Sequence, residues 1–451
     1  MFKTLHSNQP AQAENLINSS HNTLNIETSL NQFSDDSKLS YQDLIDDLAI
    51  GCKPKDQWKI GIELEQFSFN TKTKKPVPYD GKHGIHALLI ELSNQYQWQI
   101  ITENGTPVAL KKNDMNLTLE PGGQIEFSGS PQATLTEAQE EMALFDQDVN
   151  AAAKTCGLSF LRKGLHPDWS RDEIHWMPKG RYKIMRRYMA KKGDHGIDMM
   201  IRSCGAQLNL DFSSEQDMIK KFRVTLALQP FITALMANSS HFDGQDTHYQ
   251  SYRAFVWTDT DPDRCGGLPF VFAKDMSFAK YVDYALDVPM YFILRDDQYI
   301  DVTGLCFRDF INGTLPGFEG QFATLTDWQN HISTLFPDVR LKRYLELRCA
   351  DSHSSEMVLA MTAFWLGALY DEKSLDRLHN LIMSWPIETH AHLSAHTAEF
   401  GLTADHDLPF DIMPLLYQVM EIVAEGLERE VHTAEEARMI EPFWDKMLDR
   451  D

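Results

Sequence analysis

The stretch Ile60-Gly-Ile-Glu-Leu-Glu-Gln-Phe67 alternates aliphatic residues with carboxylates. In an extended strand, residues two positions apart project to the same face, and the residue between them projects to the other face. Glu63 and Glu65 would therefore share one face, while Ile62 and Leu64 would share the opposite face. We predict a β-strand with an aliphatic core side and an acidic side.

Three further segments carry polar groups two residues apart with aliphatic residues between them. They are Glu120–Gly129 with Gln124 and Glu126, Ala206–Phe212 with Gln207, Asn209 and Asp211, and Tyr344–Arg348 with Glu346 and Arg348. If the four strands share a sheet, one face is a core and the opposite face is a basin rich in carboxylates. Carboxylates that lie close together need cations or protons to neutralise them. The pattern therefore predicts a site for a hard divalent metal with phosphate beside it.

The composition limits the class of protein. The 451 residues are 43% hydrophobic, which is enough for a sizeable core, and the formal net charge is −23. This charge argues against a sequence-independent nucleic-acid binder and against a polybasic membrane binder. The six cysteines form no Cys-x-x-Cys pair, so we expect neither a zinc motif nor a secreted disulfide scaffold. Without a signal-peptide pattern or a run of about 20 apolar residues, we expect a soluble cytoplasmic protein.

Long helical patterns alternate with the polar-faced strands. Helical spacing appears at 40–50, 81–96, 134–155, 213–236, 358–370 and 415–438. There are no internal repeats and no Gly/Ser-rich linkers, so we predict one interleaved domain over residues 39–451, with helices covering the aliphatic side of the sheet. Residues 1–38 are rich in Asn, Ser and Gln, and we expect a weakly ordered N-terminal extension there.

Two segments combine basic and aromatic residues in this acidic chain. Met177–Arg187 contains Lys179 and Arg181, and its basic side chains suit either a solvated helix face or phosphate. Further on, Arg253 and Trp257 suit a carboxylate and its aliphatic stem. No P-loop, dinucleotide-binding glycine motif, zinc-protease motif or serine-hydrolase motif occurs. A bound nucleotide would therefore have its phosphates held at the acidic, metal-binding sheet.

Together these segments resemble glutamate–cysteine ligase of the plant and proteobacterial type, also called γ-glutamylcysteine synthetase. The resemblance runs from about Tyr41 to near the C-terminus. The matching motifs, in order, are Cys52–Lys55, Ile60–Phe67, Leu119–Glu126, Met177–Tyr182, Gln207–Ser214, Trp257–Arg264, Tyr281–Phe292 and Arg340–Arg348. The resemblance implies an α+β fold like the catalytic domain of glutamine synthetase, in which a curved, largely antiparallel sheet forms a cup with helices on its outer face.

The resemblance also implies an activity. This is the ATP-dependent ligation of the γ-carboxyl of L-glutamate to the amine of L-cysteine through γ-glutamyl phosphate, the first step of glutathione biosynthesis. ATP would be the co-substrate, and Mg²⁺, or Mn²⁺ in its place, would be the metal. The expected partners are small molecules, without nucleic acid or membrane, and the chain would act as a monomer or a homodimer.

The family's site residues can be carried over onto matching positions of this chain. The metal ligands would be Glu63, Glu65, Glu126 and Glu346, with Gln124 and Glu120 behind them or structural. The catalytic residues would be Arg348, as the cation for the transferring phosphoryl group, together with Glu63 and Glu346. The ATP-binding residues would be Lys179, Arg181, Gln207 and Asn209. Arg253 and Trp257 would hold the α-carboxylate and stem of glutamate, and no cysteine would be catalytic.

Three positions depart from the usual pattern of the family. Leu64 stands where His is usual, and by alternation it should face the core without affecting the acidic face. Gly205 and Ala206 stand where Thr and Val are frequent, which removes side-chain volume near the expected substrate pocket. Cys349 occupies a position that is often Gly.

Three other functions stay open at this point. A related carboxylate–amine ligase would join glutamate to a different amine, and its amine selectivity would distinguish it. A metal-dependent hydrolase would activate water on the carboxylate cluster and turn over without ATP, but it leaves Arg348 without a clear task. A catalytically idle, ligand-sensing relative would normally lack Arg348 or one of the metal glutamates, whereas this chain has them all.

Overall fold

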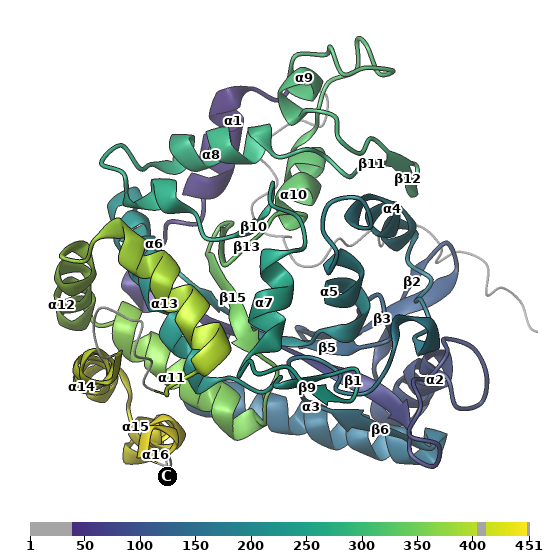
Figure 1. Cartoon of the computed structure of the whole chain (residues 1–451). Coiled ribbons are helices and arrows are strands. Elements are labelled where there is room, and N and C mark those ends of the chain that lie inside the picture. The colour runs from purple at the N-terminus through teal and green to yellow at the C-terminus, as the bar shows by residue number, and fades with distance from the viewer. Residues whose placement is uncertain (1–37, 404–411, 449–451) are drawn as a thin grey trace, which may run out of the picture. The chain divides into compact units, whose positions relative to one another are not determined.

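The computed structural model describes residues 38–403 and 412–448. The chain divides into two compact units, Met1–Lys38 and Leu39–Asp451, and every helix and strand named below belongs to the second unit (Figure 1). The predicted N-terminal extension lies outside the described residues, apart from Lys38.

A nine-stranded sheet forms the centre of the second unit, and its strands pair antiparallel throughout. In sheet order the strands are β14 (Val339–Leu341), β15 (Leu345–Asp351), β7 (Gly205–Leu210), β1 (Ile60–Asn70), β5 (Ile125–Ser128), β4 (Met115–Leu119), β3 (Thr106–Lys112) and β2 (Gln99–Glu103), and β6 (Leu158–Leu161) pairs with the end of β1. This open antiparallel sheet with helices packed on it confirms the predicted α+β fold.

The alternation predicted for the four polar-faced segments is confirmed. Along β1, Ile62 and Leu64 are buried, whereas Glu63 and Glu65 are half-buried. Leu64, which stands where the family usually has His, faces the core as expected. The register places Glu65 opposite Glu126, Glu63 opposite Gln207, and Asn209 opposite Glu346. Residues directly opposite each other in an antiparallel pair share a face, so all four segments contribute to one polar face.

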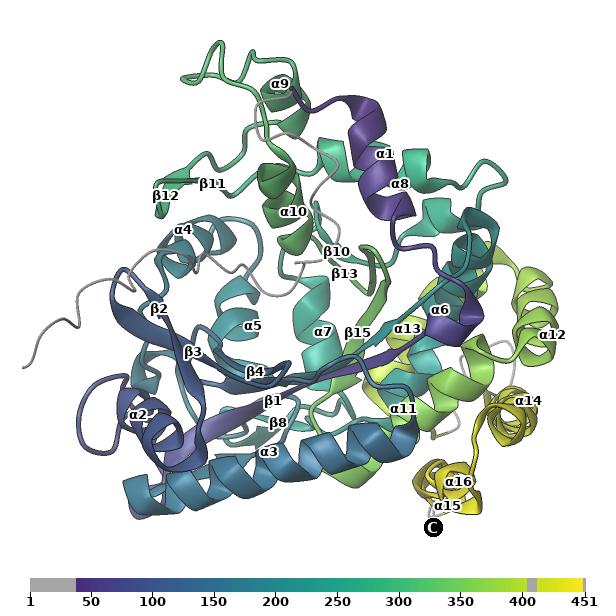
Figure 2. The same ribbon diagram turned by 180° about the vertical axis from the view of Figure 1, so that it is seen from behind.

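Three long helices cover the aliphatic side of the sheet. They are α3 (Leu135–Cys156), α6 (Glu215–Leu235) and α11 (Ser355–Leu369), and Figure 2 shows α3 running beneath β1. Helix α3 begins at a capping box formed by Thr134 and Glu137 and ends at Gly157, whose φ is +71°. Nearly every side chain of α11 is buried, as expected of a helix with other helices around it.

Shorter helices lie over the polar face of the sheet. They are α4 (Gly180–Met189), α5 (Gly196–Arg202) and α7 (Tyr252–Thr258), with α10 (Leu325–Ser333) beside them (Figure 1). A short parallel pair, β10 (Cys265–Gly266) with β13 (Phe336–Pro337), connects this layer to the sheet through β14. These elements enclose the space above the carboxylates.

The remaining elements lie around this framework. The helices are α1 (Tyr41–Ala49), α2 (Ile85–Tyr96), α8 (Phe278–Asp287), α9 (Phe307–Ile311), α12 (Glu372–Met383), α13 (Ile387–Phe400), α14 (Ile412–Glu430), α15 (Ala434–Arg438) and α16 (Glu441–Leu448). The 3₁₀ turns are Lys55–Gln57, Arg171–Glu173 and Pro269–Phe272, and the hairpins are β8 (His241–Phe242) with β9 (Gln245–Asp246) and β11 (Phe292–Arg295) with β12 (Gln298–Asp301).

The helix predicted over 415–438 is interrupted. It ends at Glu430, and a second helix starts at Ala434 because the Thr433 side chain caps its N-terminus. None of the helices within residues 38–403 and 412–448 is long and apolar enough to span a membrane.

Candidate active site

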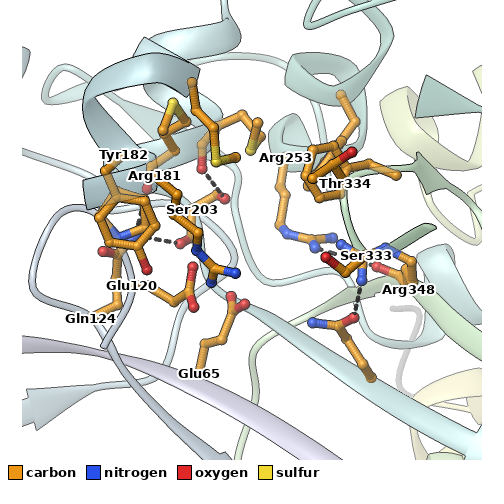
Figure 3. Close-up of a pocket in the computed structure, with 17 residues that line it drawn as sticks. Glu65, Glu120, Gln124, Arg181, Tyr182, Ser203, Arg253, Ser333, Thr334 and Arg348 are labelled. Atoms are coloured by element: carbon orange, nitrogen blue, oxygen red, sulfur yellow. Dashed lines mark hydrogen bonds between the residues drawn. The ribbon is translucent and has the colours of Figure 1, made fainter. Parts of the chain in front are cut away.

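A cavity lies between the polar face of the sheet and the helices above it. Its wall includes six of the eleven residues assigned to the site from the sequence: Glu65, Gln207 and Arg348 from strands, Arg181 from α4, and Arg253 and Trp257 from α7. Glu120 and Gln124, which were expected behind the metal ligands or as structural residues, also line it. In Figure 3, Glu65 and Glu120 lie close to Arg181, and Arg253 and Arg348 lie across the cavity from them. Carboxylates and guanidinium groups therefore share one enclosed space.

The other five predicted residues lie beside this cavity and not on its wall. They are Glu63, Glu126, Glu346, Lys179 and Asn209. The Lys179 ammonium donates a hydrogen bond to the Leu119 carbonyl at 2.7 Å. The Asn209 side-chain amide donates to Glu63 Oε1 at 2.8 Å. Both side chains therefore already have protein partners in this arrangement.

Three half-buried carboxylates on β1 and β5, those of Glu63, Glu65 and Glu126, hold their protons unusually tightly. Burial, followed by the charges of Glu120 and Glu126, raises the pKa of Glu65 to about 8. Burial, with Glu346 and Glu126 next in size, raises the pKa of Glu63 to about 7. The pKa of Glu126 is also raised, first by burial and then by Glu120. These carboxylates therefore need additional positive charge to ionise together near neutral pH.

The carboxylate set fits a magnesium ion whose coordination is completed by phosphate. Mg²⁺ takes oxygen ligands and is usually bound by one or two carboxylates together with water and substrate phosphates. Glu65 lies opposite Glu126 in the sheet, and Glu63 is on the same face of β1. In the described part of the chain, no three His, Cys, Asp or Glu side chains form a closed metal site. The protein would thus supply part of the coordination shell and ATP the remainder.

Glu346 has different surroundings from the other three glutamates. It is fully buried, and its carboxylate contacts Arg340 at 2.5 Å, Lys342 at 3.0 Å and Arg348 at 2.7 Å. Burial by itself raises the pKa of Glu346, but the positive charges of Arg340, Lys342 and Arg348 outweigh burial and hold it well below its usual value. A metal ion at this carboxylate would meet three cations. Its assignment as a metal ligand stays a prediction.

Arg348 is held in place from several sides. Its Nη1 donates to Gln207 Oε1 at 2.5 Å and to Glu346 Oε1 at 2.7 Å. Its guanidinium carbon lies 6.0 Å from the ring centre of Trp257 and 5.6 Å from that of Phe336. A guanidinium fixed in this way at the cavity wall can stabilise negative charge without first reorganising.

Several buried donors around the cavity have no hydrogen-bond partner among the described residues. They include Arg181 Nε, Arg253 Nε and Trp257 Nε1. Unpaired buried donors are rare and costly, so their concentration at one cavity indicates a ligand with acceptor atoms. Negatively charged oxygens of a carboxylate or phosphate would satisfy all three.

Gly205 makes room for one of these arginines. A Cβ atom at this position would lie 2.5 Å from Arg253 Nη2. The guanidinium also donates to the carbonyls of Cys349 at 3.2 Å and Arg348 at 3.3 Å. The absence of the family's usual Thr at this position therefore lets Arg253 lie directly against the end of β7.

Sequence reasoning missed part of the cavity wall. Tyr182, Ser203, Ser333, Thr334 and Phe336 also line it. Tyr182 lies in the Met177–Tyr182 motif, but its hydroxyl donates to the Leu119 carbonyl at 2.5 Å. The pair Ser333–Thr334 ends α10 and carries no recognisable motif, because such residues at a helix terminus are common.

Comparison with known proteins places this geometry in a family. A model named glutamate-cysteine ligase family 2 matches residues 59–447. The chain is 47% identical over 394 residues to the chloroplastic glutamate–cysteine ligase of Medicago truncatula, covering 87% of this chain and 76% of that protein. The chloroplastic enzyme of Solanum lycopersicum is 46% identical over the same share of this chain and 74% of its own.

A solved structure supports the fold. The glutamate–cysteine ligase of Francisella tularensis in complex with AMP aligns with a TM-score of 0.52 at 12% identity, covering 87% of this chain and 82% of that chain. The likeness at this identity concerns the fold alone, and it agrees with the open antiparallel sheet described above.

The comparison with the plant sequences corrects the expected cellular location. The matched plant relatives are labelled chloroplastic, and this finding contradicts the cytoplasmic prediction. The prediction rested on the lack of a signal-peptide pattern and of a membrane-length apolar run, and neither pattern detects plastid targeting segments, which are amphipathic and rich in Arg and Ser. The extent and identity of the sequence matches show that the chain belongs to glutamate–cysteine ligase family 2.

Proposed function

We propose that this protein is an enzyme that uses ATP to join the γ-carboxyl of L-glutamate to the amine of L-cysteine. Its similarity to glutamate–cysteine ligases over 87% of the chain carries this proposal. The cavity agrees with it, because Arg181, Arg253 and Arg348 line the same enclosed space as Glu65. A hydrolase that only activates water would not need three arginines and their unpaired donors.

The first step would activate the carboxylate. An oxygen of the glutamate γ-carboxylate attacks the γ-phosphorus of ATP, the bond to the β-phosphate oxygen breaks, and ADP leaves γ-glutamyl phosphate behind. Negative charge spreads over the oxygens of the transferring group, so positioning and charge stabilisation dominate this step. Arg348 is suited to that task because Gln207 and Glu346 fix its guanidinium.

Other cations would bind the remaining anionic groups. Arg181 lines the cavity on the side of Glu120, where it would contact the ATP phosphates with Lys179 behind it. Gln207 and Asn209 would complete the nucleotide side. Arg253 and Trp257 would hold the α-carboxylate and stem of glutamate, using donors that lack a protein partner.

Magnesium would be held by Glu65 and Glu126, with Glu63 beside them, and when bound it would neutralise phosphate charge during the transfer. These three carboxylates have raised pKa values without a cation, which is the behaviour expected of ligands that ionise fully when metal is present.

The second step would form the amide. The cysteine amine, after losing a proton, attacks the acyl carbon; the C–N bond forms, the bond to the phosphate oxygen breaks, and phosphate leaves as the nitrogen loses a further proton. No protein nucleophile is required, and none of the cysteines lines this cavity.

The test is ADP release by purified protein with Mg-ATP and glutamate, with and without cysteine, repeated with 2-aminobutyrate. Release that depends on both amino acids, with a γ-glutamyl dipeptide of the right mass, is the expected result. Release that needs glutamate but ignores cysteine would move the proposal to a ligase for another amine. Release without any amino acid would contradict ligation altogether.

A further inference from the structure

Arg340 of β14 lies behind the wall of the cavity. It is 6% exposed and does not line the cavity itself. In the β14–β15 pair it lies directly opposite Glu346. Its Nε donates to Glu346 Oε2 at 2.8 Å, and its Nη2 donates to Glu346 Oε1 at 2.5 Å. Arg340 and Glu346 therefore form a bidentate ion pair, in which the planar guanidinium fixes the orientation of the carboxylate.

The third nitrogen of Arg340 holds the end of α10. Its Nη1 donates to the carbonyl of Ser333 at 2.8 Å and to that of Leu335 at 2.7 Å. The last carbonyls of a helix have no partner within the helix, and a cation beside them also favours the helix dipole. Between these two residues, the carbonyl of Thr334 accepts a hydrogen bond at 3.1 Å from Nη1 of Arg264, which is fully buried. Two buried guanidinium groups thus fix three successive carbonyls.

The segment that Arg340 holds belongs to the cavity wall. Ser333 and Thr334 line the cavity and lie on the same side of it as Arg348 (Figure 3). Arg348 is connected to Arg340 by a second route, because its Nη1 donates to Glu346 Oε1 at 2.7 Å. One buried guanidinium therefore joins two parts of the site, Arg348 through Glu346 and the end of α10 directly.

We propose that Arg340 is a positioning residue for phosphoryl transfer, which keeps Arg348 and the wall at Ser333 and Thr334 in fixed relative positions. This inference rests on the proposed ligase activity and adds a residue to which the sequence motifs assign no role. Arg340 acts through other residues, since all three nitrogens of its guanidinium are engaged within the protein. A displacement of about 1 Å at a reacting group can cost about 10²-fold in rate, so loosening this connection should slow the chemical step more than it weakens substrate binding.

Arg340→Lys tests the connection. Lysine keeps a positive charge near Glu346, but one ammonium cannot replace the contacts that three separate nitrogens make. Steady-state ADP release should show a kcat about 10- to 100-fold lower, with the KM values for glutamate and ATP within about threefold of wild type. Arg340→Gln, which removes the charge as well, should lower kcat at least as far. Glu346 keeps Lys342 and Arg348 as partners in both variants, so its buried carboxylate is not left without a cation, and thermal unfolding should show a folded protein.

Arg295→Lys is the matched control. Arg295 of β11 holds the other end of α10, because its Nη1 and Nη2 donate to the two carboxylate oxygens of Asp327 at 2.7 and 2.8 Å. It does not line the cavity and has no contact with Glu346 or with the end of α10. The control should lower the melting temperature and keep kcat within about twofold of wild type, because it loosens the helix without touching the connection to Arg348.

A double-mutant cycle with Arg348→Lys separates positioning from a merely structural role. If Arg340 acts through Arg348, its replacement should matter little once Arg348 is already replaced. In the Arg348→Lys background, Arg340→Lys should lower kcat by less than about threefold. Two independent sites would instead multiply their separate effects on kcat.

The outcomes separate this inference from the proposed function. Folded Arg340→Lys and Arg340→Gln enzymes with kcat within about threefold of wild type would overturn the positioning role. An equal fold-loss of kcat in the wild-type and Arg348→Lys backgrounds would also overturn it, as would an equal loss in Arg295→Lys. Unfolding of both Arg340 variants would make Arg340 a structural residue only. If the wild-type protein forms no γ-glutamyl dipeptide from ATP, glutamate and cysteine, the ligase proposal itself is wrong.

Discussion

Replacing Arg348 by lysine should slow the phosphoryl-transfer step while leaving the fold intact. The Arg348 Nη1 atom alone makes the contacts to Gln207 at 2.5 Å and to Glu346 at 2.7 Å. Lysine keeps the positive charge and could make these contacts, but its single ammonium lacks the remaining guanidinium donors that would bind the transferring group. Losing one preorganised donor to a developing charge typically lowers kcat about 10²- to 10³-fold. The structural cost should be smaller, about 1 kcal/mol, because Glu346 retains Arg340 and Lys342 as partners.

The assay is steady-state ADP release with each substrate varied in turn, combined with thermal unfolding. A matched control is Arg343→Lys, because Arg343 lies in the same hairpin but pairs with Asp47 at 2.7 Å, and it does not line the cavity. The control should keep kcat within about twofold of wild type. A folded Arg348→Lys enzyme with kcat within about threefold of wild type would refute the role of this guanidinium in the transition state.

Three further predictions concern the carboxylates and Gly205. Glu126→Gln should lower kcat at least 100-fold at saturating Mg²⁺, as expected when a metal ligand is lost. It should also raise the melting temperature of the metal-free protein, because one of several clustered negative charges is removed. An unchanged kcat would remove Glu126 from the metal site. Without metal, the pKa of Glu65 is raised to about 8, so the protonated carboxyl favours the folded state. This stabilisation is complete below pH about 4 and is lost as the pH rises through 8. Calorimetry in EDTA should therefore show a melting temperature that falls from pH 5 to 8.5. Glu65→Gln should flatten that profile, whereas an equal slope in both proteins would contradict the shift. Gly205→Thr should displace the guanidinium of Arg253, because the added side chain would occupy its position. Steady-state assays should then show a KM for glutamate about tenfold higher, with little change in kcat. An unaltered KM would place the α-carboxylate of glutamate elsewhere.

Much of the fold could be predicted because it depends on short-range patterns. The period-2 alternation at Ile60–Phe67 identifies a strand with one core face, and the register confirms that Glu65 and Glu126 share the opposite face. The predicted end of the helix over 415–438 was wrong. The helix ends at Glu430, and the Thr433 side chain caps a separate helix that begins at Ala434. Local capping chemistry decides such boundaries more than hydrophobic spacing does.

The site was harder to predict, because alternation gives the face of a residue and not its partners. Glu346 has the same strand pattern as Glu63, yet Arg340 and Lys342 neutralise it, while Glu63 has a raised pKa. The hairpin between β14 and β15 brings those cations to one carboxylate.

The sequence likewise gives no sign of how α7, which carries Arg253 and Trp257, is connected to β15, which carries Arg348. Asp351, at the end of β15, accepts hydrogen bonds from Ser239 Oγ at 2.7 Å and Ser251 Oγ at 2.9 Å. Ser251 caps the N-terminus of α7, and Ser239 Oγ accepts the backbone N–H of Arg253 at 3.1 Å. One buried carboxylate therefore fixes the helix that carries Arg253 and Trp257 to the strand that carries Arg348. Because these residues are about 100 positions apart in the sequence, only the folded chain brings the proposed glutamate-binding arginine and the proposed phosphoryl-binding arginine into one rigid unit.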